Sequence, residues 1–172
     1  MKIGIFYGPT GGSTEKVANL ISKEFGTKNT ELVLVKNSTL KELAKFDKVI
    51  FGISTIGKET WDAHHPNTDW DYFFSTVLEA DFSNKTVALF GLGNSTSYSF
   101  HFVDALGKLG HKLINKKANI VGQCSTDGYT YDESEAVIDG KFIGLPIDED
   151  SEEDLTEGRV KKWVDQIRPD FL

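Results

Sequence analysis

The sequence has very little cysteine and no long apolar run. Cys124 is the only cysteine in 172 residues, so no internal disulfide can form. We expect it to be a small buried hydrophobe rather than a nucleophile. No stretch approaches the roughly 18 apolar residues of a membrane span, and no secretory apolar region precedes the first strand pattern. We therefore expect a cytoplasmic protein with one domain over residues 1–172, long enough to bury a full core.

Basic residues are fewer than acidic ones. The chain has 19 lysines and arginines against 26 acidic residues, a net charge of −7. Such a chain is repelled by nucleic-acid phosphates and by anionic lipid headgroups, so the charge argues against nucleic-acid and membrane binding. Docking to a basic protein stays open, beside the simpler explanation that moderate acidity aids solubility.

The four histidines do not suggest a metal centre. His64 and His65 are adjacent, and adjacent side chains do not share one face as metal ligands on a helix do. No cysteine or spaced acid completes a ligand set. We expect no metal site.

Two familiar phosphate-binding motifs are missing from the first turn of the chain. Ser13 stands where a Walker loop needs lysine, and the dinucleotide pattern G-x-G-x-x-G does not occur there. The turn instead reads GPTGGST over residues 8–14. Neither of those two ways of holding a nucleotide is therefore available to it.

This glycine-rich turn joins a predicted strand to a predicted helix. The unpaired N–H groups of a first helical turn and the helix dipole attract anions. Gly11 and Gly12 let the backbone approach a phosphate closely, and Thr10, Ser13 and Thr14 add hydroxyl donors. We predict a monophosphate site; the alternative is an ordinary turn with Ser13 or Thr14 as the helix N-cap.

Apolar strand patterns and helical patterns alternate along the chain. Strands are predicted at 3–7, 31–35, 48–53, 86–90 and from 119, and helices at 13–25, 39–44, from 68 or 69, from about 102 and at 153–167. Continuous apolar strands with helices between them indicate a parallel sheet covered on both faces. In such sheets ligands bind beyond the carboxyl ends of the strands, so the loops at 8–14, 54–62 and 91–98 should meet there.

Glycines and apolar stripes predict the ends and the buried faces of these helices. The first helix should end at Gly26 and the fourth at Gly110. The third should bury the stripe Trp70, Phe73, Phe74, Val77 and Leu78, and the last should bury Val160, Trp163, Val164 and Ile167.

Residues 122–150 interrupt the alternation. We interpret them as an excursion from the fifth strand that returns to the sheet through a second β run at 141–147. Seven acidic residues then lie between Asp148 and Glu157. We expect these acids to form a solvated helix start, where the dipole favours negative charge.

Four segments together resemble the flavodoxin family, and specifically its long-chain members. They are KIGIFYG with GGSTEKVA, KTVALFGLGNSTSY with DALG, STDGYTYDESEAVIDGKFIGLPIDED, and RVKKWVDQI. The third is the most specific, because short-chain members lack it. The resemblance covers essentially the whole chain. It implies an α/β fold with a doubly wound five-stranded parallel sheet in the order 2-1-3-4-5, helices on both faces and an insertion in the fifth strand.

The resemblance also implies bound FMN, whose phosphate would lie in the first loop. The family's loop usually reads T/S-x-T-G-x-T, and the aligned residues are Pro9, Thr10, Gly11, Gly12, Ser13 and Thr14. Gly12 and Thr14 match. Pro9 and Gly11 replace hydroxyl residues, and Pro9 also lacks an N–H. Thr10 and Ser13 would then supply hydroxyls from shifted positions.

The second loop stands where the family lines the inner face of the isoalloxazine ring, with Ser54, Thr55, Ile56 and Gly57. Trp61 either folds back over the ring or packs on the following helix. Gly57 occupies the place where family members flip a peptide to hydrogen-bond flavin N5 in the semiquinone. Glycine lowers the cost of that flip because positive φ is open to it.

The third loop contains Gly93, Asn94 and Tyr98. Tyr98 matches the tyrosine that stacks on the outer face of the ring, and its large π-face suits that role. Asn94 stands where the family usually has aspartate. Its amide can accept a hydrogen bond from flavin N3–H, but one local negative charge is lost.

The resemblance implies a low-potential one-electron carrier rather than an enzyme. It would be a monomer that meets basic redox proteins, namely a flavodoxin/ferredoxin reductase as donor and a low-potential acceptor. Two alternatives stay open. One is an NAD(P)H-dependent FMN quinone or flavin reductase, although the chain shows no second nucleotide motif. The other is a flavodoxin-like binding module with a weakened FMN site, which Pro9, Gly11 and Asn94 would support.

Overall fold

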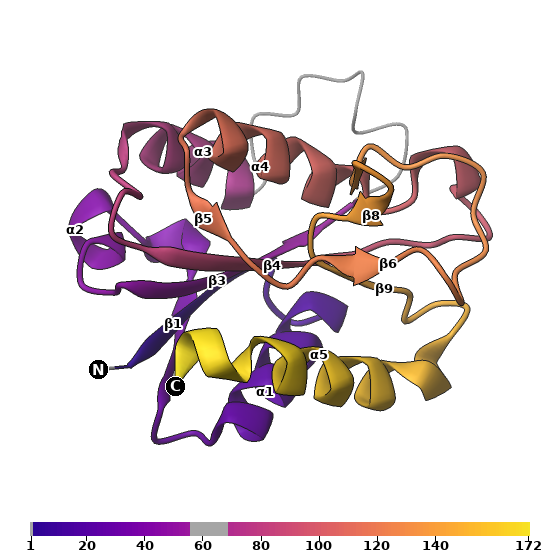
Figure 1. Ribbon diagram of the computed structural model, residues 1–172, viewed down its shortest axis with the longest axis horizontal. Helices are drawn as coiled ribbons and strands as arrows, with labels where there is room; N and C mark the ends of the chain where they lie inside the picture. The colour runs from indigo at the N-terminus through magenta and orange to yellow at the C-terminus, as the bar shows by residue number, and fades with distance from the viewer. Residues whose placement is uncertain (1, 56–68) are drawn as a thin grey trace.

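The structure is a computed structural model that describes residues 2–55 and 69–172. Its centre is a parallel sheet in the order β2-β1-β3-β4-β5, with β9 also paired to β4 (Figure 1). The strands are β1 (Ile3–Gly8), β2 (Thr30–Leu34), β3 (Lys48–Ser54), β4 (Thr86–Leu92), β5 (Asn119–Ile120) and β9 (Leu145–Ile147). The predicted strand order and the parallel sheet are confirmed.

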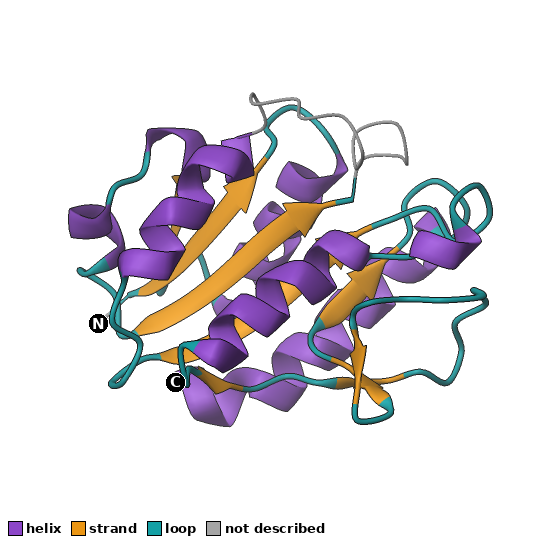
Figure 2. Cartoon of the chain, turned by 90° about the horizontal axis from the view of Figure 1, so that it is seen from above, coloured by secondary structure: helices purple, strands orange, loops and turns teal. Residues whose placement is uncertain are grey.

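Helices cover both faces of the sheet, as Figures 1 and 2 show. One face carries α1 (Ser13–Phe25) and α5 (Thr156–Phe171), and the other carries α2 (Leu40–Leu43), α3 (Asp69–Glu79) and α4 (Asp104–Asn115). Among the described residues, short 3-10 turns lie at η1 (Val35–Asn37), η3 (Ser99–His101) and η4 (Glu153–Leu155). Within the described ranges no helix is both long and apolar enough to cross a membrane.

Two apolar cores hold the layers together. Under α1 and α5, the helix residues Val17, Ile21 and Trp163 pack against the sheet and are almost fully buried. On the other face, Phe6 and Phe51 stack among the aromatic side chains of α3. Burial on both faces explains why the strands read as continuous apolar runs rather than alternating ones.

The excursion from the fifth strand forms a small antiparallel sheet. Its order is β6-β8-β7, from β6 (Cys124–Ser125), β7 (Val137–Ile138) and β8 (Lys141–Phe142). The return to the main sheet is confirmed, because Leu145–Ile147 pairs in parallel with β4. The predicted β run at 141–147 is divided, since its first part belongs to the small sheet.

The prediction that the fourth helix stops at Gly110 is wrong. Helix α4 begins at Asp104, after Phe102 and Val103, and continues to Asn115. A Cβ on Gly110 would lie 2.9 Å from the side chain of Ile143. This glycine therefore permits close packing of the insertion on the helix and does not end the helix.

Two smaller expectations about helices also differ from the structure. Leu78, predicted on the buried stripe of α3, is 50% exposed. The last helix begins at Thr156 and extends to Phe171, since residues 153–155 form a 3-10 turn. Its predicted apolar stripe is confirmed, with all four members buried.

Candidate functional site

The three predicted ligand loops start at adjacent strand ends. Gly8 of β1 is in register with Ile53 of β3, and Ser54 of β3 is in register with Leu92 of β4. The N–H of Thr55 donates to the carbonyl of Leu92 at 2.8 Å. The loops after β1, β3 and β4 thus leave the same end of the sheet, as expected for a ligand site of this architecture.

The first loop leads into α1 with its amides unprotected. Gly12 is the N-cap, and no side chain caps the helix. The N–H groups of Ser13, Thr14 and Glu15 have no acceptor in the part of the chain that the structure describes. A Cβ on Gly11, at φ +77°, or on Gly12 would meet no atom within 4 Å, so the space above the loop is open. This is the geometry of an anion-binding helix start.

The alternative interpretation of this turn is wrong in its detail, because neither Ser13 nor Thr14 is the N-cap. Thr14 is 2% exposed and Ser13 is exposed. Thr10 is half-buried, and Pro9 is exposed after a cis Gly8–Pro9 peptide bond. The loop therefore presents backbone amides more than hydroxyls.

Glu15 is not among the predicted site residues, but its carboxylate folds back onto this loop. Its Oε2 accepts from the N–H of Gly11 at 2.5 Å, and its Oε1 accepts from the hydroxyl of Tyr7 at 3.3 Å. Burial, together with the charge and hydrogen bond of Glu15, raises the pKa of Tyr7. An acid three residues after an N-cap was the available signal, since it is the usual partner of the amides there. A carboxylate thus already contacts an amide of the predicted phosphate loop.

The second loop is described only at its start. Ser54 and Thr55 are half-buried, and Thr55 Oγ1 accepts from the N–H of Ala105 at 3.0 Å. Thr55 therefore satisfies an amide in the first turn of α4, a capping role. The predictions for Ile56, Gly57 and Trp61, and for the histidine pair, fall outside the described residues.

The third loop is shaped by Asn94. Its Oδ1 accepts from the N–H groups of Thr96 at 3.1 Å and Ser97 at 2.8 Å. These bonds occupy both lone pairs of the amide oxygen, the atom that is predicted to accept from flavin N3–H. Tyr98 follows with 41% of its surface exposed. A Cβ on Gly93 would lie 2.9 Å from the backbone nitrogen of Val103, so glycine is required there.

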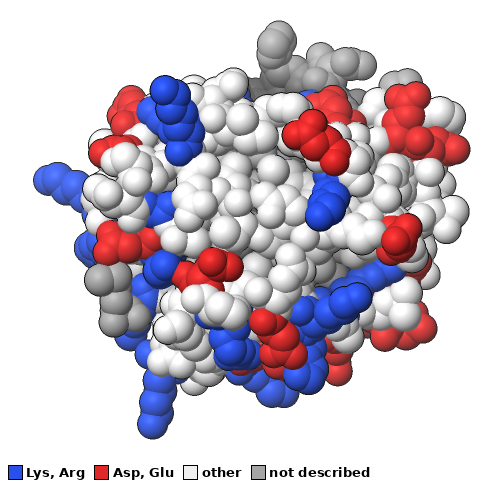
Figure 3. Space-filling view, in the orientation of Figure 1, with Lys and Arg blue, Asp and Glu red and all other residues white. Residues whose placement is uncertain are grey.

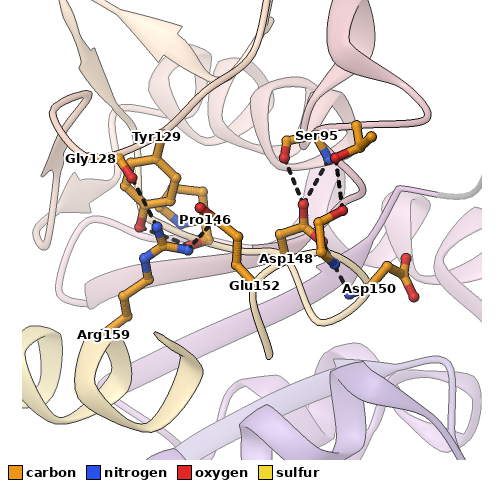
Figure 4. A network of polar contacts seen from close by, with 10 residues as sticks. Ser95, Gly128, Tyr129, Pro146, Asp148, Asp150, Glu152 and Arg159 are labelled. Atoms are coloured by element: carbon orange, nitrogen blue, oxygen red, sulfur yellow. Dashed lines mark hydrogen bonds and ion pairs between the residues drawn. The ribbon is translucent and has the colours of Figure 1, made fainter. Parts of the chain in front are cut away.

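Asp148 holds the third loop from below, as Figure 4 shows. It is fully buried and accepts from Ser95 N–H at 2.9 Å, Ser95 Oγ at 2.7 Å, Asp150 N–H at 3.0 Å and Ser151 N–H at 2.8 Å. The expectation of solvated acids is therefore wrong at this position. Burial alone would raise the pKa of Asp148, but the hydrogen bonds from Ser95, Ser151 and Asp150 outweigh it and the pKa lies below its usual value.

The described part of the chain shows no cluster of three or more histidine, cysteine or acidic side chains arranged for a metal. Cys124 is mostly buried, and burial raises the pKa of its thiol to about 12. A protonated thiol is a poor nucleophile, in agreement with its predicted role as a small hydrophobe.

The residues present fit FMN, the cofactor that the resemblance implies. Unpaired amides at the start of α1 suit a phosphate, and an exposed tyrosine at the neighbouring strand end suits a flat ring. The carboxylate of Glu15 occupies one amide in the way an anion would.

Comparisons with known proteins agree with this geometry. The family model described as Flavodoxin matches residues 5–163. The flavodoxin of Buchnera aphidicola subsp. Acyrthosiphon pisum is 43% identical over 171 residues, which cover 99% of this chain and 97% of that protein. The flavodoxin of Helicobacter pylori is 41% identical over 170 residues, with 99% and 98% covered. The crystal structure of Fusobacterium nucleatum flavodoxin bound to flavin mononucleotide superposes with a TM-score of 0.88 at 32% identity, covering 99% of each chain.

Proposed function

The chain belongs to the flavodoxin family, and from that premise we propose that FMN binds across the three loops that leave β1, β3 and β4. As a flavodoxin, the protein is an FMN-containing electron carrier between partner proteins and is not an enzyme. The cofactor supplies the redox chemistry, and the chain binds, orients and tunes it. The observation that carries the binding mode is the set of unpaired amides at the start of α1.

The phosphate would lie over residues 9–14. The unpaired N–H groups of Ser13, Thr14 and Glu15 at the start of α1 would donate to it, with the hydroxyls of Thr10 and Ser13 at the margin. Pro9 and Gly11 contribute no side-chain donor. The phosphate is therefore held by backbone amides and by the helix dipole, with no lysine or arginine in the loop.

The ring would lie between the second and third loops. Tyr98 would cover its outer face, and Gly93 and Asn94 would give the third loop the shape that receives its edge. Ser54 and Thr55 would begin the inner wall, and Ile56, Gly57 and Trp61 remain its predicted continuation. Apolar and aromatic walls exclude water and disfavour added negative charge on a buried ligand. Asp148 and Asp150 behind the loop act in the same direction.

Stepwise reduction of the FMN-loaded protein tests this function. We expect a bound-flavin absorption spectrum that changes in two resolved one-electron steps, without oxidation of added NAD(P)H. A single two-electron step with rapid NAD(P)H turnover would support the reductase alternative. A protein that takes up no added FMN would support the binding-module alternative.

Replacing Asn94 with alanine should weaken FMN binding about fivefold. The variant loses two hydrogen bonds that fix the turn, each worth about 0.5–1 kcal/mol. Part of this loss reduces the free energy of FMN binding, because the bound ring needs the turn in this shape. Asn94→Asp is the matched control, because a carboxylate oxygen can accept the same two bonds. Fluorescence titration of FMN measures both variants. Equal affinity of Asn94→Ala and the parent chain would show that the turn does not need this side chain.

We also propose where a basic redox partner docks. Phe100 is 58% exposed beside Tyr98, and the exposed acids Asp132 and Glu133 are tied to the same turn through N–H bonds to the Ser99 carbonyl. Acidic side chains line this end of the molecule, at the right of Figure 3. An exposed aromatic side chain flanked by acidic side chains is complementary in charge to a basic patch on a reductase.

The double variant Asp132→Asn/Glu133→Gln should slow electron transfer from a flavodoxin/ferredoxin reductase about tenfold at low salt, because electrostatic steering weakens. Stopped-flow absorbance measures this rate. Glu24→Gln, at the far end of α1, is the control for net charge. The rate of the parent chain should fall as salt rises, and a rate insensitive to both salt and the double variant would place the docking surface elsewhere. A monomer of one domain acting in the cytoplasm is part of the same proposal.

A further inference from the structure

Helix α5 presents one polar face to the insertion. Residues 159, 162, 163 and 166 lie on this face at i, i+3, i+4 and i+7. Three of them donate to backbone carbonyls: Arg159 to Gly128 at 3.0 Å, Trp163 to Gly122 at 2.8 Å and Gln166 to Gln123 at 3.0 Å. The helix and the insertion are thus fixed to each other at three points along the helix.

A cavity of about 390 Å³ lies between these attachments. Leu145 and Trp163 form a buried apolar part of its wall, and Tyr129 and Cys124 extend it. Because the thiol of Cys124 stays protonated at neutral pH, it adds no charge. The volume is within the range of small-molecule sites, and a largely apolar wall with few polar groups is typical of them.

The charged side chains at the mouth differ in whether they are paired. Arg159 is neutralised by Glu152 at 2.6 Å and lies over the ring of Tyr129 at 4.1 Å, as Figure 4 shows. The carboxylate of Asp127 also lines the mouth, beyond ion-pair distance of Lys162. Across residues 2–55 and 69–172, the ammonium of Lys162 has no hydrogen-bond or ion-pair partner.

The neighbouring Lys161 shows the contrast. It pairs with Asp165 at 3.1 Å on the outer face of the helix. Lys162 instead stands at an apolar cavity whose other polar wall groups from α5 are already paired. An unpaired cation beside an apolar wall favours a ligand that brings both a ring and one negative charge.

We propose that this cavity binds a small aromatic monocarboxylate, with its ring against Leu145, Tyr129 and Trp163 and its carboxylate at the ammonium of Lys162. None of the lining residues belongs to the three loops of the FMN site, so the inference does not depend on the proposed function.

Titration of the FMN-loaded, 15N-labelled protein with 2-naphthoate tests the proposal. We expect the indole N–H signal of Trp163 and the amide signal of Cys124 to shift and to saturate at about millimolar ligand. A compound of two rings has enough atoms to reach that affinity at an ordinary binding free energy per atom. Lys162→Gln should weaken binding about fourfold, the value of one exposed charge pair, and Lys161→Gln should leave it unchanged. The neutral 2-naphthamide should bind the parent chain and Lys162→Gln equally.

A second measurement detects ligand in the same cavity without changing any charge of the protein. Cys124 is the only cysteine, so saturating 2-naphthoate should slow its alkylation at least twofold. The proposal is overturned if neither Trp163 nor Cys124 responds, if the shifts map only to the FMN loops, or if the two lysine variants lose equal affinity.

Discussion

Asp148→Asn is expected to destabilise the protein by about 3 kcal/mol and to weaken FMN binding. The carboxylate accepts four hydrogen bonds, two on each oxygen, in a fully buried position. An amide keeps one oxygen and turns its NH2 group toward two donors, which leaves them unsatisfied at a cost of about 1–3 kcal/mol each, partly relieved by rotation of the Ser95 hydroxyl. Urea unfolding of the FMN-free chain measures the free energy directly.

Asp150→Asn is the matched control in the same loop. Its exposed carboxylate contacts only the Asn94 side chain among the described residues, at 3.3 Å, so we expect a change below about 0.5 kcal/mol. The release of Ser95 by Asp148→Asn should also loosen the third loop and lower FMN affinity. A stability loss at Asp148 no larger than that at Asp150 would contradict the structural role assigned here.

The contribution of Asp148 should depend on pH in one direction. Its pKa in the folded protein lies below the usual value of about 3.9 in an unfolded chain, so the unfolded state takes up the proton first. The stabilisation is fully present above about pH 5 and is lost as the pH falls through the folded pKa. The difference in unfolding free energy between the parent chain and Asp148→Asn should therefore be constant from about pH 5 to 8 and shrink below about pH 4. A constant difference down to pH 2 would contradict this.

Glu15→Gln is expected to tighten FMN binding about tenfold. The Glu15 carboxylate is bonded to the Gly11 amide, so the phosphate must bind beside a negative charge or displace it. A glutamine oxygen can keep the bond to Gly11 and thus the loop shape, while the repulsion between the two anions is removed. At an effective dielectric constant near the surface that repulsion is about 1–2 kcal/mol, which corresponds to roughly tenfold in affinity.

Two comparisons isolate this effect. Riboflavin lacks the phosphate, so its affinity should be unchanged in Glu15→Gln. Glu24→Gln removes the same charge at the other end of α1 and should change neither ligand's affinity appreciably. The gain for FMN should also diminish at high salt. Weaker FMN binding by Glu15→Gln would mean that the carboxylate organises the loop for the phosphate instead of competing with it.

Periodicity was sufficient to predict a parallel sheet covered by helices on both faces, whereas the strand order followed from the family resemblance. The apolar strands, the stripe on α5 and the end of α1 at Gly26 all follow from local patterns, because each buries a face or closes a helix by itself. The positions of the three loops followed from the parallel sheet. Local pattern also singled out residues 8–14 as the predicted phosphate loop, and the space above its glycines is open.

The errors arise where a residue's role is decided by a distant segment. Gly110 has the appearance of a helix stop, but the Ile143 side chain needs the space above it. Asp148 belongs to a run of acids whose pattern indicates exposure to solvent. It is buried instead, and Ser95, 53 residues earlier, donates two hydrogen bonds to its carboxylate. Thr55, which is predicted to line the ligand site, also accepts from the N–H of Ala105 in α4, and no local pattern indicates that contact. Such partners are set by tertiary contacts, which periodicity and composition do not contain.

The division of the last strand into β5 and β9 bears on how copies of the chain meet one another. Long, flat, unpaired strands act as templates for intermolecular β-pairing and fibril growth. The sheet edge beside β4 consists of two short strands, with two residues in β5 (Asn119–Ile120) and three in β9 (Leu145–Ile147). A folded insertion separates them along the chain. Neither piece presents the six or so consecutive residues that a cross-β segment requires. This edge of the sheet therefore offers no long template for β-pairing with another copy of the chain.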